Sequence, residues 1–346
     1  MTASRDAAAA LALRSAAGGR TGSPMTSTPP PPTTAATRAQ LERLRNAVLS
    51  VWRGRSELVD LVLIGFCAGG HVLLEDIPGV GKTTLAKALA AAMGGRLQRL
   101  QCTPDLMPAD ISGISVYDDE EKGFVFHPGP VFTDVLLADE LNRTPPRTQS
   151  ALLEAMSEGQ VTVDGLPRPL PPCFFCIATQ NPQEHVGTYP LPESQKDRFL
   201  LCFSLGYPDR DRERDLLRGD GAEADLAVLR PVMDLAAAQA LRHEVRAVQV
   251  SEAVESYLLD LVAATRASRA VAIGASPRAA QALALAAKVR ALLDGRYNVS
   301  FEDVRRVFLP ALRHRIILNF EAQAEDVRPD RVLLDLLEQT PEKEPG

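Results

Sequence analysis

Residues 71–84 read HVLLEDIPGVGKTT, an apolar run that breaks into a glycine loop and leads into a helical pattern, LAKALAAAMG. This order predicts a strand, a tight loop and a helix. Glycines allow backbone N–H groups to turn inward around phosphate oxygens, and the helix N-terminus adds the positive end of its dipole. Lys82 can reach the outer phosphates of a nucleoside triphosphate, and the Thr83 hydroxyl can ligate Mg²⁺. We expect the nucleotide to contact Pro78, Gly79, Val80, Gly81, Lys82, Thr83 and Thr84.

A second motif is an apolar strand that ends in two acids, VLLADE at residues 135–140. Ligands of an open α/β sheet bind at the carboxyl ends of its strands. Asp139 is therefore expected to hold Mg²⁺, and Glu140 is expected to orient and deprotonate the attacking water. The first loop departs from the usual pattern, which has Gly where this chain has Asp76. A glycine-rich turn that only joins a strand to a helix is the alternative, and the acidic strand argues against it.

A third apolar run, CFFCIAT at residues 173–179, ends in a Gln-Asn-Pro sequence. The amide of Asn181, at the tip of a neighbouring strand, can hold the same water. The run also contains Cys173 and Cys176, but residues three apart on a strand point to opposite faces, so these thiols cannot share a metal ion. We expect the five cysteines to be reduced, buried thiols of a cytoplasmic protein.

These motifs together resemble the MoxR family of AAA+ ATPases over residues 40–335. The segments that carry the resemblance are GGHVLLEDIPGVGKT, TPDLMPADISG, GPVFTDVLLADELNR, LLEAMSEGQVTVDG, IATQNP, GTYPLPESQKDRF and GASPRA. The resemblance implies an α/β P-loop core, with a parallel sheet flanked by helices, and a C-terminal all-helical lid. The chain departs from its relatives at Lys196, where they often have Leu, and at Asp134, where they often have Asn.

The resemblance also assigns roles to residues of this chain. Lys82 and Thr83 are expected to form the Walker A pair, and Asp139 and Glu140 the Walker B pair. Asn181 is expected to be the first sensor of the nucleotide.

Two arginines receive roles by the same resemblance. Arg198 is the expected finger that reaches the nucleotide of a neighbouring subunit, although Asp197 beside it could simply neutralise it. Arg278 is the expected second sensor. It follows Ser276 and Pro277, which are the cap and first residue of an Ala-rich helix, and a cation there opposes the helix dipole by roughly 0.3–1 kcal/mol. An anionic phosphate would compensate, whereas the alternative for both arginines is an ordinary surface residue.

Composition and patterning predict four regions. Residues 1–38 are expected to be a disordered tail, 39–207 the nucleotide-binding core, 208–335 the helical lid and 336–346 a C-terminal tail. The N-terminal stretch has charges inside its apolar run, which argues against a signal peptide. No apolar run reaches the length of a membrane span.

Two hairpins are expected within the core. One pairs residues 114–117 with 123–126 around the acidic turn DDEEKG, and a smaller one begins at residues 160–164. In MoxR relatives such insertions project from the ring. The acidic turn and the net charge of −6 argue against binding to a phosphate backbone.

The functional expectation is an ATP hydrolase that uses Mg²⁺ and works as a homo-oligomeric ring, by resemblance a hexamer. The resemblance implies chaperone-like remodelling or maturation of a partner complex, with a von Willebrand A domain protein as the partner. The motor subunit of a metal-chelatase complex and a nucleic-acid-linked AAA+ motor remain alternatives. A small-molecule phosphotransferase has no use for a trans arginine, and a non-enzymatic scaffold has no use for Glu140.

Overall fold

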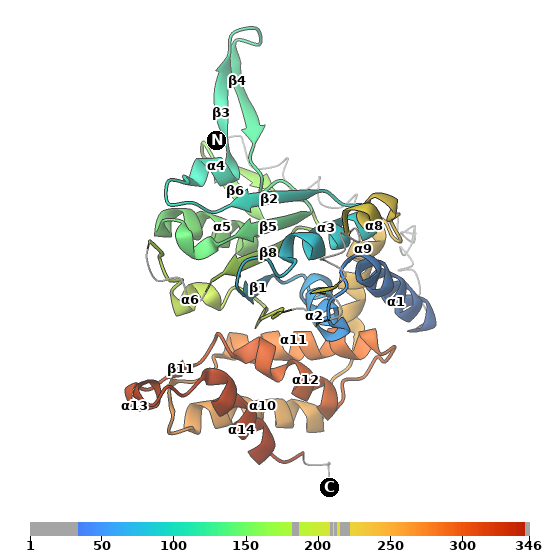
Figure 1. Cartoon of the computed structure of the whole chain (residues 1–346), viewed down its shortest axis with the longest axis vertical. Coiled ribbons are helices and arrows are strands. Elements are labelled where there is room, and N and C mark those ends of the chain that lie inside the picture. Colours follow the sequence, from blue (N-terminus) through green and yellow to red (C-terminus); the bar gives the residue numbers. More distant parts are fainter. Residues whose placement is uncertain (1–33, 182–186, 208–209, 211–212, 215–221, 343–346) are drawn as a thin grey trace, which may run out of the picture. The chain divides into compact units, whose positions relative to one another are not determined.

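The core of the protein is a parallel sheet. The computed structural model describes residues 34–181, 187–207, 210, 213–214 and 222–342. Five parallel strands lie in the order β2-β5-β8-β1-β9 (Figure 1). Their bounds are β1 (Val72–Glu75), β2 (Leu97–Gln101), β5 (Val135–Asp139), β8 (Phe175–Gln180) and β9 (Leu201–Phe203). Helices cover both faces, as parallel sheets require, so the predicted α/β class is confirmed.

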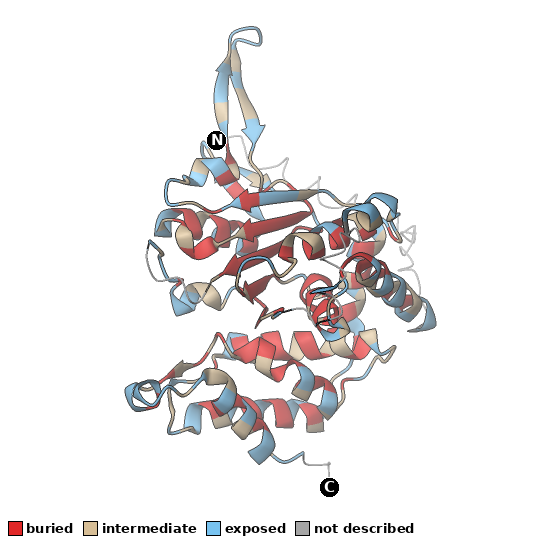
Figure 2. Ribbon diagram, viewed as in Figure 1, coloured by how far each residue is buried: buried red, intermediate tan, exposed pale blue. Residues whose placement is uncertain are grey.

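Successive residues of the strands point alternately into two cores, one on each face of the sheet. The central strands β5 and β8 are buried along most of their length (Figure 2). On one face, Val72 and Phe175 pack with α1 (Thr34–Val51), α2 (Ser56–Cys67) and α3 (Lys82–Ala92). On the other face, Leu136 packs with α5 (Pro146–Glu158). Cys173 belongs to the first core and Cys176 to the second. Their expected separation is confirmed, although β8 begins only at Phe175 and Cys173 precedes it.

Both expected hairpins are present. The first consists of β3 (Gly113–Asp118) and β4 (Gly123–Pro128) and projects away from the sheet (Figure 1). It follows α4 (Pro108–Ser112). The second consists of β6 (Gln160–Val163) and β7 (Leu166–Pro169). The two hairpins contact each other through Arg168 of β7 and Phe126 of β4. The guanidinium carbon of Arg168 lies 3.7 Å from the centroid of the Phe126 ring.

The C-terminal part is helical, as expected. Its elements are α10 (Glu252–Ala267), α11 (Pro277–Leu293), α12 (Phe301–Leu312), α13 (Phe320–Ala324) and α14 (Pro329–Gln339). It also contains a short antiparallel ribbon of β10 (Val271–Ile273) and β11 (Ile317–Leu318), which we did not expect. Among the described residues, no helix is long and apolar enough to cross a membrane.

The expected domain boundaries shift where packing extends an element. Helix α1 begins at Thr34, inside the tail expected to end at residue 38, because Leu41 and Leu44 anchor it in the core. Helix α14 continues past residue 335 to Gln339, with Leu337 buried. Residues 1–33 of the expected tail and 343–346 lie outside the described part.

Two helices expected in the lid pack on the core instead. Helix α8 (Ala222–Val228) contacts α1 and α3, and α9 (Leu235–Glu244) contacts α2. Arg242 of α9 donates to the carbonyl oxygens of Phe66 and Pro172 at 3.0 Å. We therefore propose that the lid begins at α10 rather than at residue 208.

Candidate nucleotide site

The glycine loop connects β1 to α3, as the sequence predicts. Gly79 and Gly81 have φ of +88° and +85°, values at which a side chain is strained. A Cβ on Gly81 would also lie 3.1 Å from Nε1 of Trp52. Lys82 is buried and donates from Nζ to the carbonyl oxygen of Asp76 at 3.5 Å. Val80 packs against the first core, while Thr83 and Thr84 follow in the first turn of α3.

The two acids lie at the tip of β5. The Asp139 carboxylate accepts from the Thr179 hydroxyl and from Arg99, both at 2.7 Å. Thr179 also accepts from the Glu140 N–H at 2.9 Å. Glu140 has φ of +59°, and non-glycine residues held in this region cluster at active sites. Its carboxylate accepts from Arg143 at 3.0 Å and from the amide of Gln101 at 3.3 Å.

Loop and acids enclose one cavity of about 230 Å³. Its lining residues are Pro78, Gly79, Gly81, Lys82, Thr83, Arg99, Gln101, Asp139 and Glu140. The donor set suits a triphosphate with Mg²⁺, because it combines glycine N–H groups, an ammonium, a hydroxyl and carboxylates. Burial, reinforced by the charge of Asp139, raises the pKa of the nearby Cys102 thiol to about 12, so this thiol is neutral.

The sequence interpretation missed Arg99, Gln101 and Thr179. Arg99 and Gln101 share one face of β2, which pairs with β5 so that Gln101 lies opposite Asp139. The alternating polar residues of this strand were a usable signal, but only after its pairing with β5 was known. Asp134, the position where relatives often have Asn, accepts instead from the Arg96 N–H at 2.8 Å.

Asn181 directly follows β8 but does not line the cavity. Its carbonyl oxygen accepts from the side-chain amide of Asn142 at 3.4 Å. The residue is half-buried. It therefore lies just beyond the end of β8, the neighbour of β5 in the sheet.

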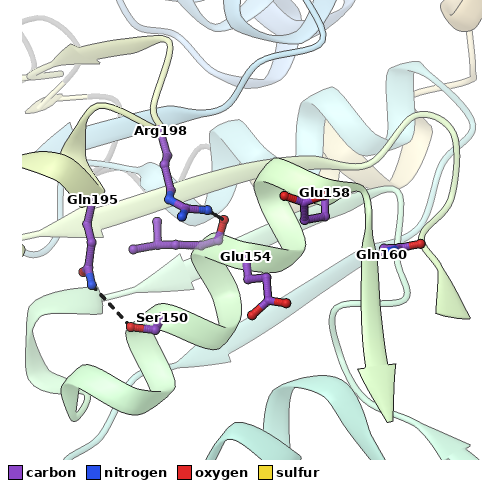
Figure 3. A pocket seen from close by; sticks show the side chains of 7 residues that line it. Ser150, Glu154, Glu158, Gln160, Gln195 and Arg198 are labelled. Carbon is purple, nitrogen blue, oxygen red and sulfur yellow. Dashed lines mark hydrogen bonds between the residues drawn. The ribbon is translucent and has the colours of Figure 1, made fainter. Parts of the chain in front are cut away.

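Arg198 lies at a second cavity of about 360 Å³ (Figure 3). The lining residues of this second cavity are Ser150, Leu153, Glu154, Glu158, Gln160, Gln195 and Arg198. The Arg198 guanidinium points toward α5 and donates to the Leu153 carbonyl at 2.9 Å and to the Ser157 hydroxyl at 2.6 Å. None of these residues lines the first cavity. Asp197 pairs with Arg315 at 2.7 Å, so it does not neutralise Arg198.

Arg278 is exposed in the first turn of α11. The expected cap is present, because the Ser276 hydroxyl accepts from the Ala279 N–H at 3.1 Å. Within the part of the chain that the structure describes, no hydrogen bond or ion pair engages Arg278. The structure does not bring it into the cavity that holds Lys82.

The single tryptophan offers a direct test of nucleotide binding at the glycine loop. Because the indole of Trp52 adjoins Gly81, we expect ATP to change its fluorescence on titration. Gly81→Ala should weaken ATP binding about tenfold, because the free loop relaxes away from the positive φ of Gly81 and ATP must then restore a conformation that costs roughly 1–2 kcal/mol. Trp52→Phe is the control and should remove the signal. An unchanged spectrum at saturating ATP, with binding shown by calorimetry, would contradict this placement.

Comparison with known proteins agrees with the fold. Residues 71–201 match the ATPase family associated with various cellular activities (AAA), and residues 263–336 match the AAA lid domain. The protein YeaC of Bacillus subtilis, which is uncharacterized, is 42% identical over 82% of this chain and 89% of its own length. Chaperone MoxR1 of Mycobacterium tuberculosis is 39% identical over 87% of this chain and 82% of its own.

A solved structure gives the same result. The crystal structure of a protein from Cytophaga hutchinsonii, assigned as an ATPase, is 36% identical with a TM-score of 0.84. The match covers 90% of this chain and 97% of that one. Sheet, lid and cavity together define an AAA-type enzyme that binds and hydrolyses ATP. Within that class, the chain belongs to the MoxR family of AAA+ ATPases.

Proposed function

We propose that this ATPase works as a homo-oligomeric ring, a hexamer, in which each nucleotide site is completed by Arg198 of the neighbouring subunit. The observation that carries the proposal is the location of Arg198 at a cavity separate from the one that contains Lys82. Arg99 lines the nucleotide cavity, but it is paired with Asp139. Head-to-tail contacts close into rings where the rotation between subunits closes, and otherwise run into filaments.

Within each site, the residues divide the work. Lys82 and the glycine N–H groups hold the phosphates. Arg278 lies outside the cavity in this structure, so its contact with the phosphates requires the lid to move with the nucleotide state. Thr83 and Asp139 would hold Mg²⁺, which neutralises charge that develops on the phosphate oxygens. Glu140 orients the attacking water and accepts its proton. The resemblance assigns contact with the same water to Asn181, which follows β8 and lies outside the cavity in this structure.

The proposed assembly makes the specific activity depend on protein concentration. In dilute solution the subunits separate, and hydrolysis should fall toward a rate roughly 10³-fold lower, because the trans arginine is lost. Hydrolysis measured across a dilution series, beside sedimentation of the same samples, checks this. A constant specific activity across the assembly transition would contradict it.

Added DNA should not stimulate turnover, because the tip of the first hairpin is acidic.

We further propose that ATP turnover drives chaperone-like remodelling or maturation of a partner complex that contains a von Willebrand A domain protein. The support is the family, in which a 39%-identical relative carries the name Chaperone MoxR1.

We also propose a cytoplasmic location. The five cysteines are all free and buried, as expected in a reducing compartment.

A further inference from the structure

Asp76 occupies the position at which the phosphate-loop pattern usually has Gly, and its carboxylate has three donors. The Ser204 hydroxyl donates to Oδ1 at 2.6 Å, the Leu205 N–H to Oδ2 at 2.6 Å and the Gly206 N–H to Oδ1 at 3.0 Å. Successive N–H groups of this kind form a nest for an anion. Here the nest belongs to the chain that follows β9, and Asp76 fills it.

The backbone of Asp76 has partners of its own. Its carbonyl oxygen accepts from the Lys82 ammonium at 3.5 Å, and its N–H donates to the Gln180 carbonyl at 3.1 Å. A side chain that is 4% exposed cannot exchange its protein partners for water. The hydrogen bonds of the Asp76 side chain with residues 204–206 therefore fix the position of the Asp76 carbonyl, which accepts from Lys82.

The other end of β9 is attached to the lid. Arg315, which follows α12, donates to the carbonyl oxygens of Leu200 at 3.0 Å and Phe199 at 2.6 Å. Its Nε donates to Asp197 at 2.7 Å. The chain thus contacts the lid just before β9 and Asp76 just after it.

We propose that Asp76 is a positioning residue for Lys82. The nest at residues 204–206 binds the Asp76 carboxylate and thereby fixes the position of Asp76. The carboxylate fixes the start of the glycine loop on the chain that leaves the core, and so aligns the lysine with the outer phosphates. Glycine at this position would leave the loop without this attachment.

Asp76→Asn tests the proposal. The asparagine side chain keeps the shape of aspartate, but its NH₂ group then faces at least one of the three groups that donate to the carboxylate. Lys82 serves the outermost phosphates. We therefore expect ATP affinity, measured by calorimetry on the full chain, to fall about tenfold, with a smaller fall for ADP. Ser204→Ala removes one donor from outside the glycine loop. It should shift the two affinities in the same direction by a smaller factor, and it carries the test if Asp76→Asn does not fold.

Asp303→Asn is the matched control. Asp303 is 1% exposed and accepts from the Ser300 N–H at 2.8 Å and from Arg296 at 2.7 Å, within the lid. The Asp303→Asn variant should have a lower Tm and an unchanged ATP affinity. If Asp76→Asn lowers the Tm as the control does, with ATP affinity intact, Asp76 is only structural. Equal losses for ATP and ADP would also overturn the proposal.

Discussion

Glu140→Gln is expected to lower ATP turnover by about 10²–10⁴-fold while ATP still binds, because the amide cannot accept a proton from water. The substitution preserves the shape of the side chain. It also keeps an oxygen for the contacts with Arg143 and Gln101. Steady-state phosphate release and calorimetric binding of ATP measure the two effects separately.

A matched control comes from the protein surface. Glu302 is exposed and pairs with Arg306 one helical turn away, so Glu302→Gln should leave turnover unchanged. Unimpaired hydrolysis in Glu140→Gln would exclude this residue as the base.

The same variant serves to identify the partner. Arrested in the ATP-bound state, Glu140→Gln should co-purify from the native cell with its partner, whereas Lys82→Ala, which should not retain ATP, provides the background. The proposal expects a protein with a von Willebrand A domain to be enriched by the first variant over the second. Reproducible enrichment of proteins that lack this domain would refute that part of the proposed function.

Arg198→Ala is expected to reduce the rate of hydrolysis by roughly 10³–10⁵-fold, the size of effect that arginine fingers have in phosphoryl transfer. ATP affinity should change little, because Arg198 lies outside the cavity that holds Lys82. The variant also loses the contacts with Leu153 and Ser157 of α5. The Tm must therefore be measured beside the rate.

Mixing two inactive variants decides between trans and cis action. In a ring of Arg198→Ala and Glu140→Gln subunits, some sites combine an intact Glu140 with an intact Arg198 from the neighbour. Hydrolysis should therefore reappear on mixing. Arg306→Ala, a surface arginine, is the control for the loss of a cation. Two inactive variants that stay inactive in verified mixed rings would exclude trans action.

Much of the fold was predictable because strong local patterns agreed with their tertiary environment. The strands that carry Lys82, Asp139 and Asn181 to one edge of the sheet were recognisable as apolar runs with polar ends. The ribbon of β10 and β11 was not, because Val271–Ile273 is too short to show a period of two. The start of α1 was missed because residues 1–38 were expected to form a disordered tail, whereas buried Leu41 and Leu44 hold the helix on the core.

The sequence by itself predicted that a glycine loop, a lysine and an acidic strand tip form a nucleotide site, because each motif is continuous in the chain and chemically specific. Only the tertiary structure decided which other residues touch that site. The Arg99 guanidinium donates to Asp139, and the Leu205 N–H, which follows β9, donates to Asp76. Both hydrogen bonds connect residues far apart in sequence. Such contacts depend on strand order and register, and neither is written in any one segment.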